Sequence, residues 1–442
     1  MGKENIEKYS LGYAILKGIV TVWHNFVHYR RVIVLGRENV RKENHNIFAP
    51  NHQNALMDAL ALACTAPGQP VFLARSDVFK NRKIASMLYY FKMLPVFRIR
   101  DGYENLRQND EVFNKTIDVI LHKNGLVILP EGNHAGFRRL RQLKKGICRI
   151  AFQTEEEKDF KLGLKIVPVG LDFSHYWKFR QVLTVSYGEP VSFEELYDTY
   201  RENPQVALNK LRDKISDGLK KVMIHIESEE DYDELNEIRE IVNGKHSGDR
   251  ENPKIMRDKE LIGKLEKASV EQPAHYKGII ERVRKIMTIS QRLNIGYFHL
   301  ERPKPRLPVH MLATAALIAL FPLFLFGFIL NYIFFKVPKL PLRSVKDKAF
   351  HSSVRFVISL LLGLIFLPVY AVLAFIFMPS WWMALLLFLM IPPSGIFAWN
   401  YILIWQKLRE RVMVRKYINR NNPEYRILRT IYGELKQELE QI

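Results

Sequence analysis

The sequence is poor in cysteine and lacks the motifs of several large enzyme classes. Only two of its 442 residues are cysteines, Cys64 and Cys148, which excludes a disulfide framework and fits a reducing compartment. The histidines have no paired ligand spacing with cysteine, so we expect no metal site. The sequence has no Gly-x-Ser-x-Gly elbow, phosphate-cradling glycine loop or dinucleotide fingerprint, which argues against the corresponding enzyme classes.

Acidic residues are scarce relative to basic ones. The chain has 66 Lys and Arg against 46 Asp and Glu, a formal net charge of +20. This excess predicts an anionic partner, either nucleic acid or lipid headgroups. The basic residues form no separate tail or stripe, and many flank long apolar segments, where anionic headgroups lie. Because no nucleic-acid reading motif is present, we expect membrane lipids as partners and no nucleic acid.

A recognisable leader is also missing, because neither a cleavable signal peptide nor a myristoylation signal is apparent at the start of the sequence. Between Tyr9 and Val27, apolar residues instead recur near helical spacing, with Tyr and Trp among them. The pattern predicts a helix within residues 1–30. An amphipathic helix in the membrane interface and a helix packed on a catalytic core both fit; the interfacial helix is our working expectation.

Short apolar runs alternate with helical patterns across residues 31–195. The runs of strand length are residues 32–36, 47–50, 70–74, 126–129, 166–170 and 184–188. Strands separated by helices predict an α/β fold, with a sheet flanked by helices. Residues 196–305 form a charged segment with a helical pattern. Within it, residues 227–240 and 246–252 are polar enough to predict exposed turns or linkers.

Three long apolar segments follow, at residues 312–335, 356–377 and 381–404. Each is long enough to cross a hydrocarbon core, which needs about 20 apolar residues. They predict an integral membrane module of two or three helices at residues 306–410, followed by a basic helical tail at residues 411–442.

Basic residues flank the first apolar segment on both sides and follow the third, so three full crossings conflict with the positive-inside rule. The hypothesis that removes the conflict makes residues 312–335, with Pro322 near their middle, re-entrant, while the other two segments form a crossing hairpin. All basic flanks and the catalytic domain then share the cytoplasmic face.

A histidine and a carboxylate, His52 and Asp58, lie where a predicted strand passes through a polar loop into a helix. A carboxylate beside a histidine fixes its tautomer and stabilises the imidazolium, which is the minimum equipment for taking a proton from an alcohol. A satisfied loop histidine and a helix-capping carboxylate are the alternative interpretations.

Three further blocks follow, at residues 94–101, 129–134 and 167–170. With all four blocks in this order and spacing, the chain resembles the glycerolipid acyltransferase family over roughly residues 30–195. The resemblance implies direct acyl transfer from a thioester, without a covalent acyl-enzyme. His52 would act as general base and Asp58 would orient it.

The resemblance also implies substrate-binding residues. Arg98 matches the arginine that binds the acceptor's phosphate, and Arg100 is its nearby rival. Glu131 matches a glutamate that contacts the acceptor, Gly132 permits close backbone approach, and Lys145 echoes a basic residue that commonly follows. Surface ion pairs are the alternative for the two arginines and the glutamate. Three neighbouring arginines either add positive potential for phosphate or coenzyme A or form a solvated face: Arg138, Arg139 and Arg141.

Two departures from the family pattern are visible. Five residues instead of four separate His52 from Asp58, so the loop after His52 must absorb the extra residue; members resembling fungal glycerol-phosphate acyltransferases share this spacing. Asn133-His134 replaces the Thr-Arg of many members, which removes an arginine from this block.

These observations predict a membrane-bound O-acyltransferase of phospholipid biosynthesis. The acyl donor would be acyl-CoA or acyl carrier protein, as co-substrate rather than bound cofactor, and the acceptor glycerol 3-phosphate or a lysophospholipid such as lysophosphatidate. The longer spacing favours glycerol 3-phosphate. The alternative is a catalytically silent membrane scaffold that binds acyl-lipid, against which the presence of His52 and Asp58 together with Arg98 and Glu131 argues.

Overall fold

The computed structural model describes residues 5–97, 108–244, 253–301 and 307–441. The chain divides into two compact units. The first runs to His225 and includes the short later segment Asp347–Ser353, and the second comprises Ile226–Lys346 and Val354–Ile442. The finer domain limits inferred from the sequence stay a prediction.

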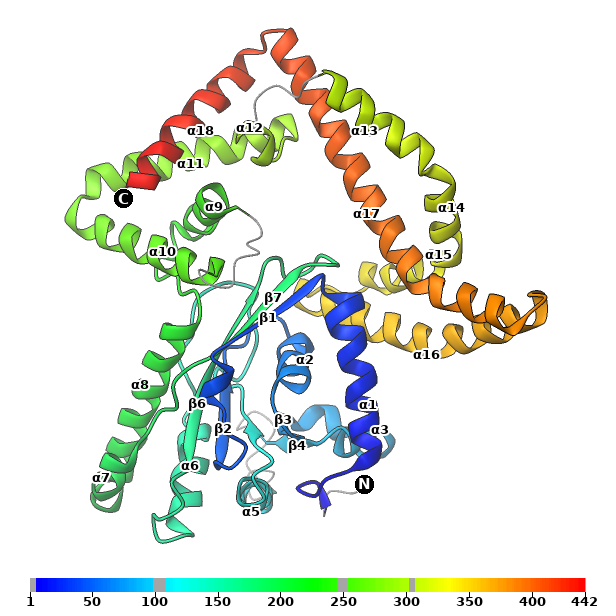
Figure 1. Ribbon diagram of the computed structural model, residues 1–442. Coiled ribbons are helices and arrows are strands. Elements are labelled where there is room, and N and C mark those ends of the chain that lie inside the picture. Colours follow the sequence, from blue (N-terminus) through cyan, green and yellow to red (C-terminus); the bar gives the residue numbers. More distant parts are fainter. Residues whose placement is uncertain (1–4, 98–107, 245–252, 302–306, 442) are drawn as a thin grey trace. The chain divides into compact units, whose positions relative to one another are not determined.

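The first unit is built on a seven-stranded sheet with the order β1-β7-β6-β2-β5-β3-β4 (Figure 1). β6, β2, β5, β3 and β4 run parallel to one another, β7 is antiparallel to β6, and β1 is parallel to β7. The strands are β1 (Arg31–Leu35), β2 (Asn46–Pro50), β3 (Val71–Arg75), β4 (Met93–Val96), β5 (Leu126–Val127), β6 (Lys165–Phe173) and β7 (Val182–Tyr187). The predicted α/β sheet is confirmed.

Two details of the sheet differ from the prediction. β4 was not predicted, because it is only four residues long and lacks a clear alternation; it is the last strand of the sheet. β5 ends at Val127, two residues before the predicted end of the run.

Helices cover both faces of this sheet. α5 (Gln108–Leu121), α6 (Gly146–Glu156) and α8 (Pro204–Val222) pack on one another and on β2, β4, β5 and β6, whereas α1 (Leu11–Val22), the π-helical turn η2 (Trp23–His28) and α2 (Leu56–Thr65) lie near β1 and β7. Two shorter helices complete the unit, α3 (Arg82–Tyr90) and α7 (Tyr197–Glu202).

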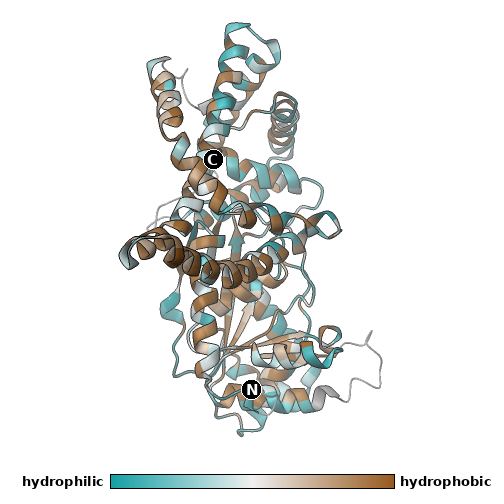
Figure 2. Ribbon diagram, turned by 90° about the vertical axis from the view of Figure 1, so that its right-hand side faces the viewer, coloured by the Kyte–Doolittle hydropathy of each residue, from teal (hydrophilic) through white to brown (hydrophobic). Residues whose placement is uncertain are grey.

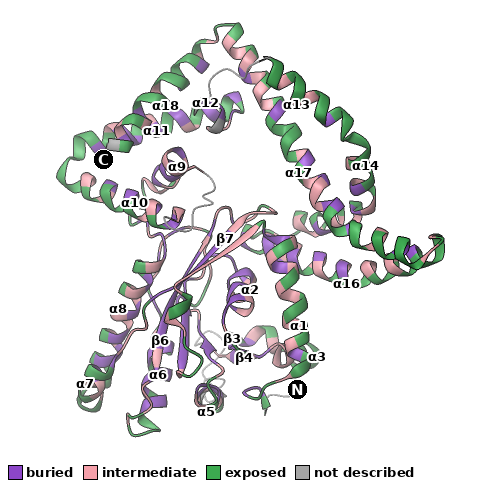
Figure 3. Ribbon diagram, viewed as in Figure 1, coloured by how far each residue is buried: buried purple, intermediate pink, exposed green. Residues whose placement is uncertain are grey.

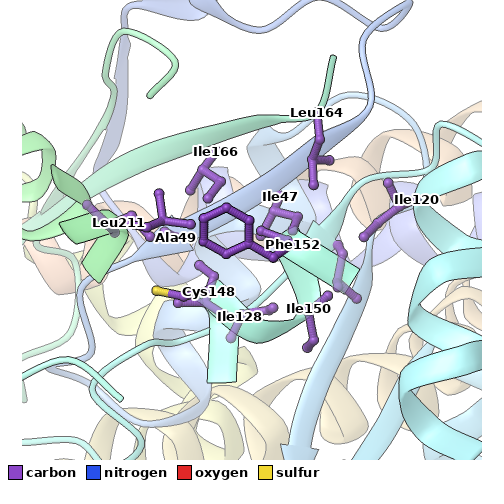
Figure 4. Packing of buried hydrophobic residues seen from close by; sticks show 14 of the residues in the cluster. Ile47, Ala49, Ile120, Ile128, Cys148, Ile150, Phe152, Leu164, Ile166 and Leu211 are labelled. Carbon is purple, nitrogen blue, oxygen red and sulfur yellow. The ribbon is translucent and has the colours of Figure 1, made fainter. Parts of the chain in front are cut away.

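The core of the first unit forms where central strands meet helices. Figure 4 shows the ring of Phe152 from α6 among Ile47 of β2, Ile166 of β6 and Leu211 of α8. All five residues of β2 are buried because it has neighbours on both sides and helices on both faces. The strand that leads into the His52 loop is therefore rigidly held.

The second unit is helical in its described residues. Its helices are α9 (Tyr232–Asn243), α10 (Lys254–Glu271), α11 (Pro273–Leu293), α12 (Phe298–Glu301), α13 (Leu307–Ala319), α14 (Phe321–Leu330), α15 (Tyr332–Lys336), α16 (His351–Phe377, whose first turn belongs to the first unit), α17 (Trp381–Asn419) and α18 (Pro423–Gln441). The predicted turn at residues 227–240 is wrong for most of its length, because α9 forms there and buries Leu235 and Ile238 at helical spacing. Residues 246–252 lie outside the described residues.

Long apolar helices occupy the region predicted to embed in a membrane. Two are long and apolar enough to span it, Lys348–Phe377 and Trp381–Asn419, and Pro308–Ala319 with Phe321–Leu330 forms a third candidate bent by 50°. Figure 2 shows strongly hydrophobic helices in brown, and Figure 3 shows α14 mostly exposed and α16 with mixed exposed and intermediate residues. The bend falls next to Pro322, where the sequence predicted an interruption.

Candidate active site

The two blocks that carry His52 and Glu131 meet at one edge of the sheet. His52 follows β2 and Glu131 follows β5, and these strands are parallel neighbours. The carboxyl ends of parallel strands open onto a common edge, where α/β folds place their sites. β6 flanks β2 on its other side, and Asn51 ties the two together, because its Oδ1 accepts from Leu171 N–H at 2.6 Å and its Nδ2 donates to Leu171 O at 3.1 Å.

His52 and Asp58 form a hydrogen-bonded pair. His52 Nδ1 lies 2.7 Å from Asp58 Oδ2, and the same oxygen accepts from the backbone N–H groups of Gln53 at 2.8 Å and Asn54 at 2.7 Å. Asp58 is fully buried. Its carboxylate therefore binds the first loop amides and orients the histidine at once, which combines the two roles that the sequence left as alternatives. With Nδ1 engaged, Nε2 is the atom that can take a proton.

The extra residue between His52 and Asp58 is absorbed at Ala55. Its φ of 48° and ψ of −124° lie outside the regions that L-residues favour. α2 begins at the next residue, Leu56, so Asp58 falls in its first turn and its carboxylate reaches back to the loop. The unusual backbone conformation thus lies in the loop before α2 and not in the helix.

Glu131 supports the backbone of the histidine. Its Oε1 accepts from His52 N–H at 2.7 Å, and its Oε2 accepts from Arg141 Nε at 2.8 Å and Arg141 N–H at 3.2 Å. Burial raises the pKa of Glu131, against the lowering effect of these hydrogen bonds. Gly132, with φ of 75°, makes the turn behind it, and its N–H donates to Leu129 O at 3.1 Å. Both glutamate oxygens are thus engaged within the protein.

Together these contacts hold a half-buried histidine at the sheet edge, an arrangement that could activate an alcohol. The Acyltransferase family model matches residues 31–172, which contain every residue of this arrangement.

Residues 31–172 form an acyltransferase-family domain. The resemblance inferred from the four sequence blocks is confirmed for this segment.

Two curated yeast proteins align with part of this domain. Glycerol-3-phosphate O-acyltransferase 2 of Saccharomyces cerevisiae is 31% identical over 134 residues, which are 30% of this chain and 18% of that protein. Glycerol-3-phosphate O-acyltransferase 1 of the same yeast is 32% identical over 117 residues, 26% of this chain and 15% of that protein. The chain thus matches less than a fifth of the length of either relative.

Among solved structures, the 1-acyl-sn-glycerophosphate acyltransferase of Thermotoga maritima is 20% identical with a TM-score of 0.30. The match covers 45% of this chain and 79% of that chain.

Arg141, which the sequence indicated only as one of three neighbouring arginines, connects parts of the acyltransferase domain. Besides its contacts to Glu131, its guanidinium donates to Asn133 Oδ1 at 2.6 Å, to Asn133 O and to His52 O at 3.3 Å. Arg141 therefore joins the histidine block to the glutamate block. An irregular loop separates it from Glu131, so no periodicity in the sequence could reveal the contact.

The neighbouring arginines also differ from a solvated face. Arg138 is buried, with Nε donating to Asp172 Oδ1 at 2.9 Å and the guanidinium donating to Phe173 O. Arg139 lies 5.3 Å from the centroid of the Phe137 ring. Arg138 and Arg141 thus form ion pairs within the domain.

Of the other predicted site residues, Lys145 lies in the described part of the chain and contacts α8. Lys145 precedes α6, and its Nζ donates to Gln205 Oε1 on α8 at 3.4 Å. Arg98 and Arg100 lie outside the described residues; β4, which leads to them, ends at Val96 on the same sheet edge as β2. In the described part of the chain, no three His, Cys, Asp or Glu side chains gather as a metal site.

Proposed function

We propose that this chain is a membrane-bound O-acyltransferase that moves a fatty acyl group from an acyl thioester to glycerol 3-phosphate or lysophosphatidate in phospholipid biosynthesis. The observation that carries the proposal is the pair of His52 Nδ1 and Asp58 Oδ2 at 2.7 Å, anchored by two backbone N–H groups at the carboxyl edge of the sheet. This pair lies in an acyltransferase-family domain.

The proposed reaction needs one proton transfer and one exchange of bonds. His52 Nε2 takes the proton of the acceptor hydroxyl, and the oxygen attacks the thioester carbonyl carbon. The C–S bond then breaks, the ester forms, and the imidazolium returns its proton to the departing thiolate. Asp58 holds the Nε2 tautomer and stabilises the positive ring. General-base catalysis of this kind typically contributes about 10²–10⁴-fold, and the thioester is already activated.

The proposed acceptor carries a phosphate. Arg98, with Arg100 as the alternative, is assigned to it, because a guanidinium meets two phosphate oxygens at once. We assign three further residues to the acceptor side of the site: Glu131, Gly132 and Lys145. Glu131 would act by binding the backbone N–H of His52. The two yeast relatives are named for glycerol 3-phosphate, and together with the longer histidine-aspartate spacing they favour it as the acceptor.

We further propose that two helices cross the membrane and that α13–α14 re-enters, with the catalytic domain on the cytoplasmic face. Contacts within the second unit support a re-entrant path along α17. Tyr401 of α17 bonds Leu317 O, and Asn331 bonds Ile391 O, about 15 Å further along the helix. The chain then turns back, because Lys339 Nζ lies 5.8 Å from the ring of Trp399.

The N-terminal helix is proposed to lie in the interface. One face of α1 packs on the domain: Tyr13 is buried, and Lys17 Nζ donates to Ala66 O and Gly68 O. The opposite face and the turn that follows expose apolar side chains at helical spacing: Leu11, Ile15, Ile19, Val22 and Phe26. An exposed apolar stripe on a firmly attached helix suits the headgroup region.

Activity is tested on the purified full-length chain in lipid nanodiscs. Radiolabelled acyl-CoA is offered with glycerol 3-phosphate, lysophosphatidate or lyso-aminolipids, beside His52→Ala. We expect transfer to glycerol 3-phosphate, reduced at least about 100-fold by the substitution. Failure to acylate any acceptor, or equal transfer by the variant, would refute the enzyme and favour a lipid-binding scaffold.

Topology is tested by cysteine accessibility in sealed vesicles of known orientation. Single cysteines replace Arg343 and, as the control on the opposite side, Ser380 between α16 and α17. Arg343→Cys should react only with reagent on the cytoplasmic side. Labelling of Arg343→Cys from the opposite, non-cytoplasmic side contradicts the re-entrant path.

A further inference from the structure

A short segment from late in the chain belongs to the first unit. Asp347–Ser353, called the strap here, contains the first turn of α16. Ala349 and Ser352 are buried, and Asp347 Oδ1 accepts from Ala349 N–H at 2.9 Å. The strap is thus a folded part of the unit that holds the acyltransferase domain, although it lies outside residues 31–172.

Strap side chains contact the domain at several points. Asp347 Oδ2 lies 3.1 Å from His134 Nε2, and the ring of Phe350 meets the His134 ring edge to face, with centroids 4.8 Å apart. Further along the strap, Ser352 Oγ lies 3.2 Å from His28 Nε2. Two of these three contacts converge on the same histidine.

His134 connects the strap to the general base. Its ring lies edge to face with that of His52, with centroids 5.5 Å apart, and it contacts Phe350 as well. The side chain of His134 is only 17% exposed. His134 stands where many members of the resembling family have an arginine, so its partners here are particular to this chain.

We propose that His134 is a positioning residue for His52, held in place by Asp347 and Phe350 of the strap. The inference rests on the proposed function. Asp347 orients His134 through Nε2, Phe350 packs against its ring, and the His134 ring limits the movement of the His52 ring. The catalytic site is therefore completed by residues at the start of α16, so the same segment that begins a membrane helix also contributes to the geometry of acyl transfer.

The physical argument is one of alignment. Asp58 fixes Nδ1 of His52, but a single hydrogen bond leaves the ring free to rock about it. An edge-to-face neighbour restricts that motion, since aromatic rings prefer this arrangement. Small displacements of a reacting group lower the rate steeply, by as much as about 100-fold per 1 Å. Loss of His134 should therefore lower kcat more than it raises KM.

The kinetic test uses the full-length chain in nanodiscs with four variants. His134→Ala removes the ring and the hydrogen bond, His134→Phe restores the ring alone, and Asp347→Ala removes the orienting carboxylate. Glu189→Ala, at an exposed carboxylate elsewhere on the first unit, is the control.

We expect His134→Ala to lower kcat about 10-fold with little change in either KM, and His134→Phe to recover part of the loss. Asp347→Ala should give a smaller loss, and the double variant His134→Ala/Asp347→Ala should be no slower than His134→Ala. Unchanged kcat, fully additive losses, or a rise in KM alone would overturn the proposal; the last would make His134 a substrate-binding residue.

A second measurement separates this inference from the proposed function. Diethyl pyrocarbonate modifies unprotonated imidazoles, and peptide mass spectrometry reports the rate at His52 alone. The rate should increase in His134→Ala and Asp347→Ala and stay unchanged in Glu189→Ala. If the wild type transfers no acyl group, the proposed function is refuted, but the modification rates at His52 still test the positioning role of His134. Equal modification rates in all variants would reject that positioning role.

Discussion

The surroundings of His52 in the first unit differ from the long helices of the second unit in what they bury and expose. Around His52 in the first unit, the polar groups Asp58, Glu131 and Arg138 are buried and bonded, within an apolar core. The long helices α16 and α17 of the second unit expose apolar side chains such as Ile365, 59% exposed. The few buried polar groups there, such as Asn331, bond across helices.

The contrast matches the solvents that we expect the two regions to contact, which are water for the first unit and lipid for α16 and α17. Burying apolar area away from water stabilises a fold by about 25 cal/mol per Å². The first unit therefore buries its apolar side chains, and polar groups are buried at the candidate site. A hydrocarbon solvent removes that driving force, so close packing and interhelical hydrogen bonds hold the second unit's apolar helices together. The following predictions test the two halves of this comparison, from the largest expected effect to the smallest.

The site in the first unit depends on a charged, buried carboxylate. Asp58→Asn should lower kcat by about 10³-fold, because the amide cannot stabilise the imidazolium. Initial rates of acyl transfer measure this loss. In the double variant His52→Ala/Asp58→Asn, the loss should equal that of His52→Ala alone; a larger loss would mean that the two residues act separately.

The Arg141–Glu131 pair tests whether buried charge in the first unit needs its partner. Arg141→Met should lower the free energy of unfolding by about 3 kcal/mol, because the glutamate stays buried without a counter-charge. Denaturant unfolding of the full chain in detergent measures it. Adding Glu131→Gln should restore part of the stability, and no recovery would show that packing alone explains the loss.

The exposed apolar surface of α16 should face lipid. Ile365→Lys should disfavour insertion by about 3 kcal/mol near the middle of the helix, which lowers the fraction of chain that resists alkaline extraction from membranes. Met256→Lys is the matched control, because Met256 is 54% exposed but lies on the charged helix α10. Equal behaviour of the two variants would contradict a lipid-facing α16.

Close packing in the second unit should tolerate no added atom. A Cβ on Gly327 would lie 2.2 Å from Ser394 O, a backbone atom, so Gly327→Ala should destabilise by about 2 kcal/mol. A Cβ on Gly395 would lie 2.6 Å from the side chain of Asn331, which can shift, although this breaks its bond to Ile391 O. Melting in detergent should therefore rank Gly327→Ala well below Gly395→Ala, and the reverse order would argue against this packing.

The smallest effect concerns the inserted residue in the first unit. Ala55→Gly should raise the free energy of unfolding by up to about 1 kcal/mol, because glycine adopts a positive φ without a steric penalty. Ala55→Val should lower it. Thermal melting distinguishes the two, and a loss of stability with glycine would mean that the loop is not strained.

Most of the sheet could be predicted from the sequence because central strands are continuous apolar runs bounded by polar loops. β2 and β6 follow this rule, whereas β4 is short and lies at the sheet edge. α9 was missed for a related reason. Its polar composition resembles a linker, and only three spaced apolar residues, Leu235, Ile238 and Ile241, show the face that it buries.

The residues of the candidate site also differ in how clearly the sequence indicated them. His52, Asp58, Glu131 and Gly132 were identified because they belong to short motifs whose members lie close in the sequence. Arg141 was not, because its contacts cross an irregular loop. Nothing in the sequence indicates that Asp347 reaches His134, since 212 residues separate them.

The sequence alone determined the fold class, the resemblance of the first unit to acyltransferases, and the presence of long apolar helices. These follow from local patterns, which chain geometry translates directly into strands, helix starts and apolar spans. Only the tertiary structure decided that Glu131 holds the histidine backbone, that Ala55 absorbs the extra residue, and that the strap meets His134. Those contacts join segments far apart in the chain, and their formation depends on how the sheet and loops pack rather than on any local preference.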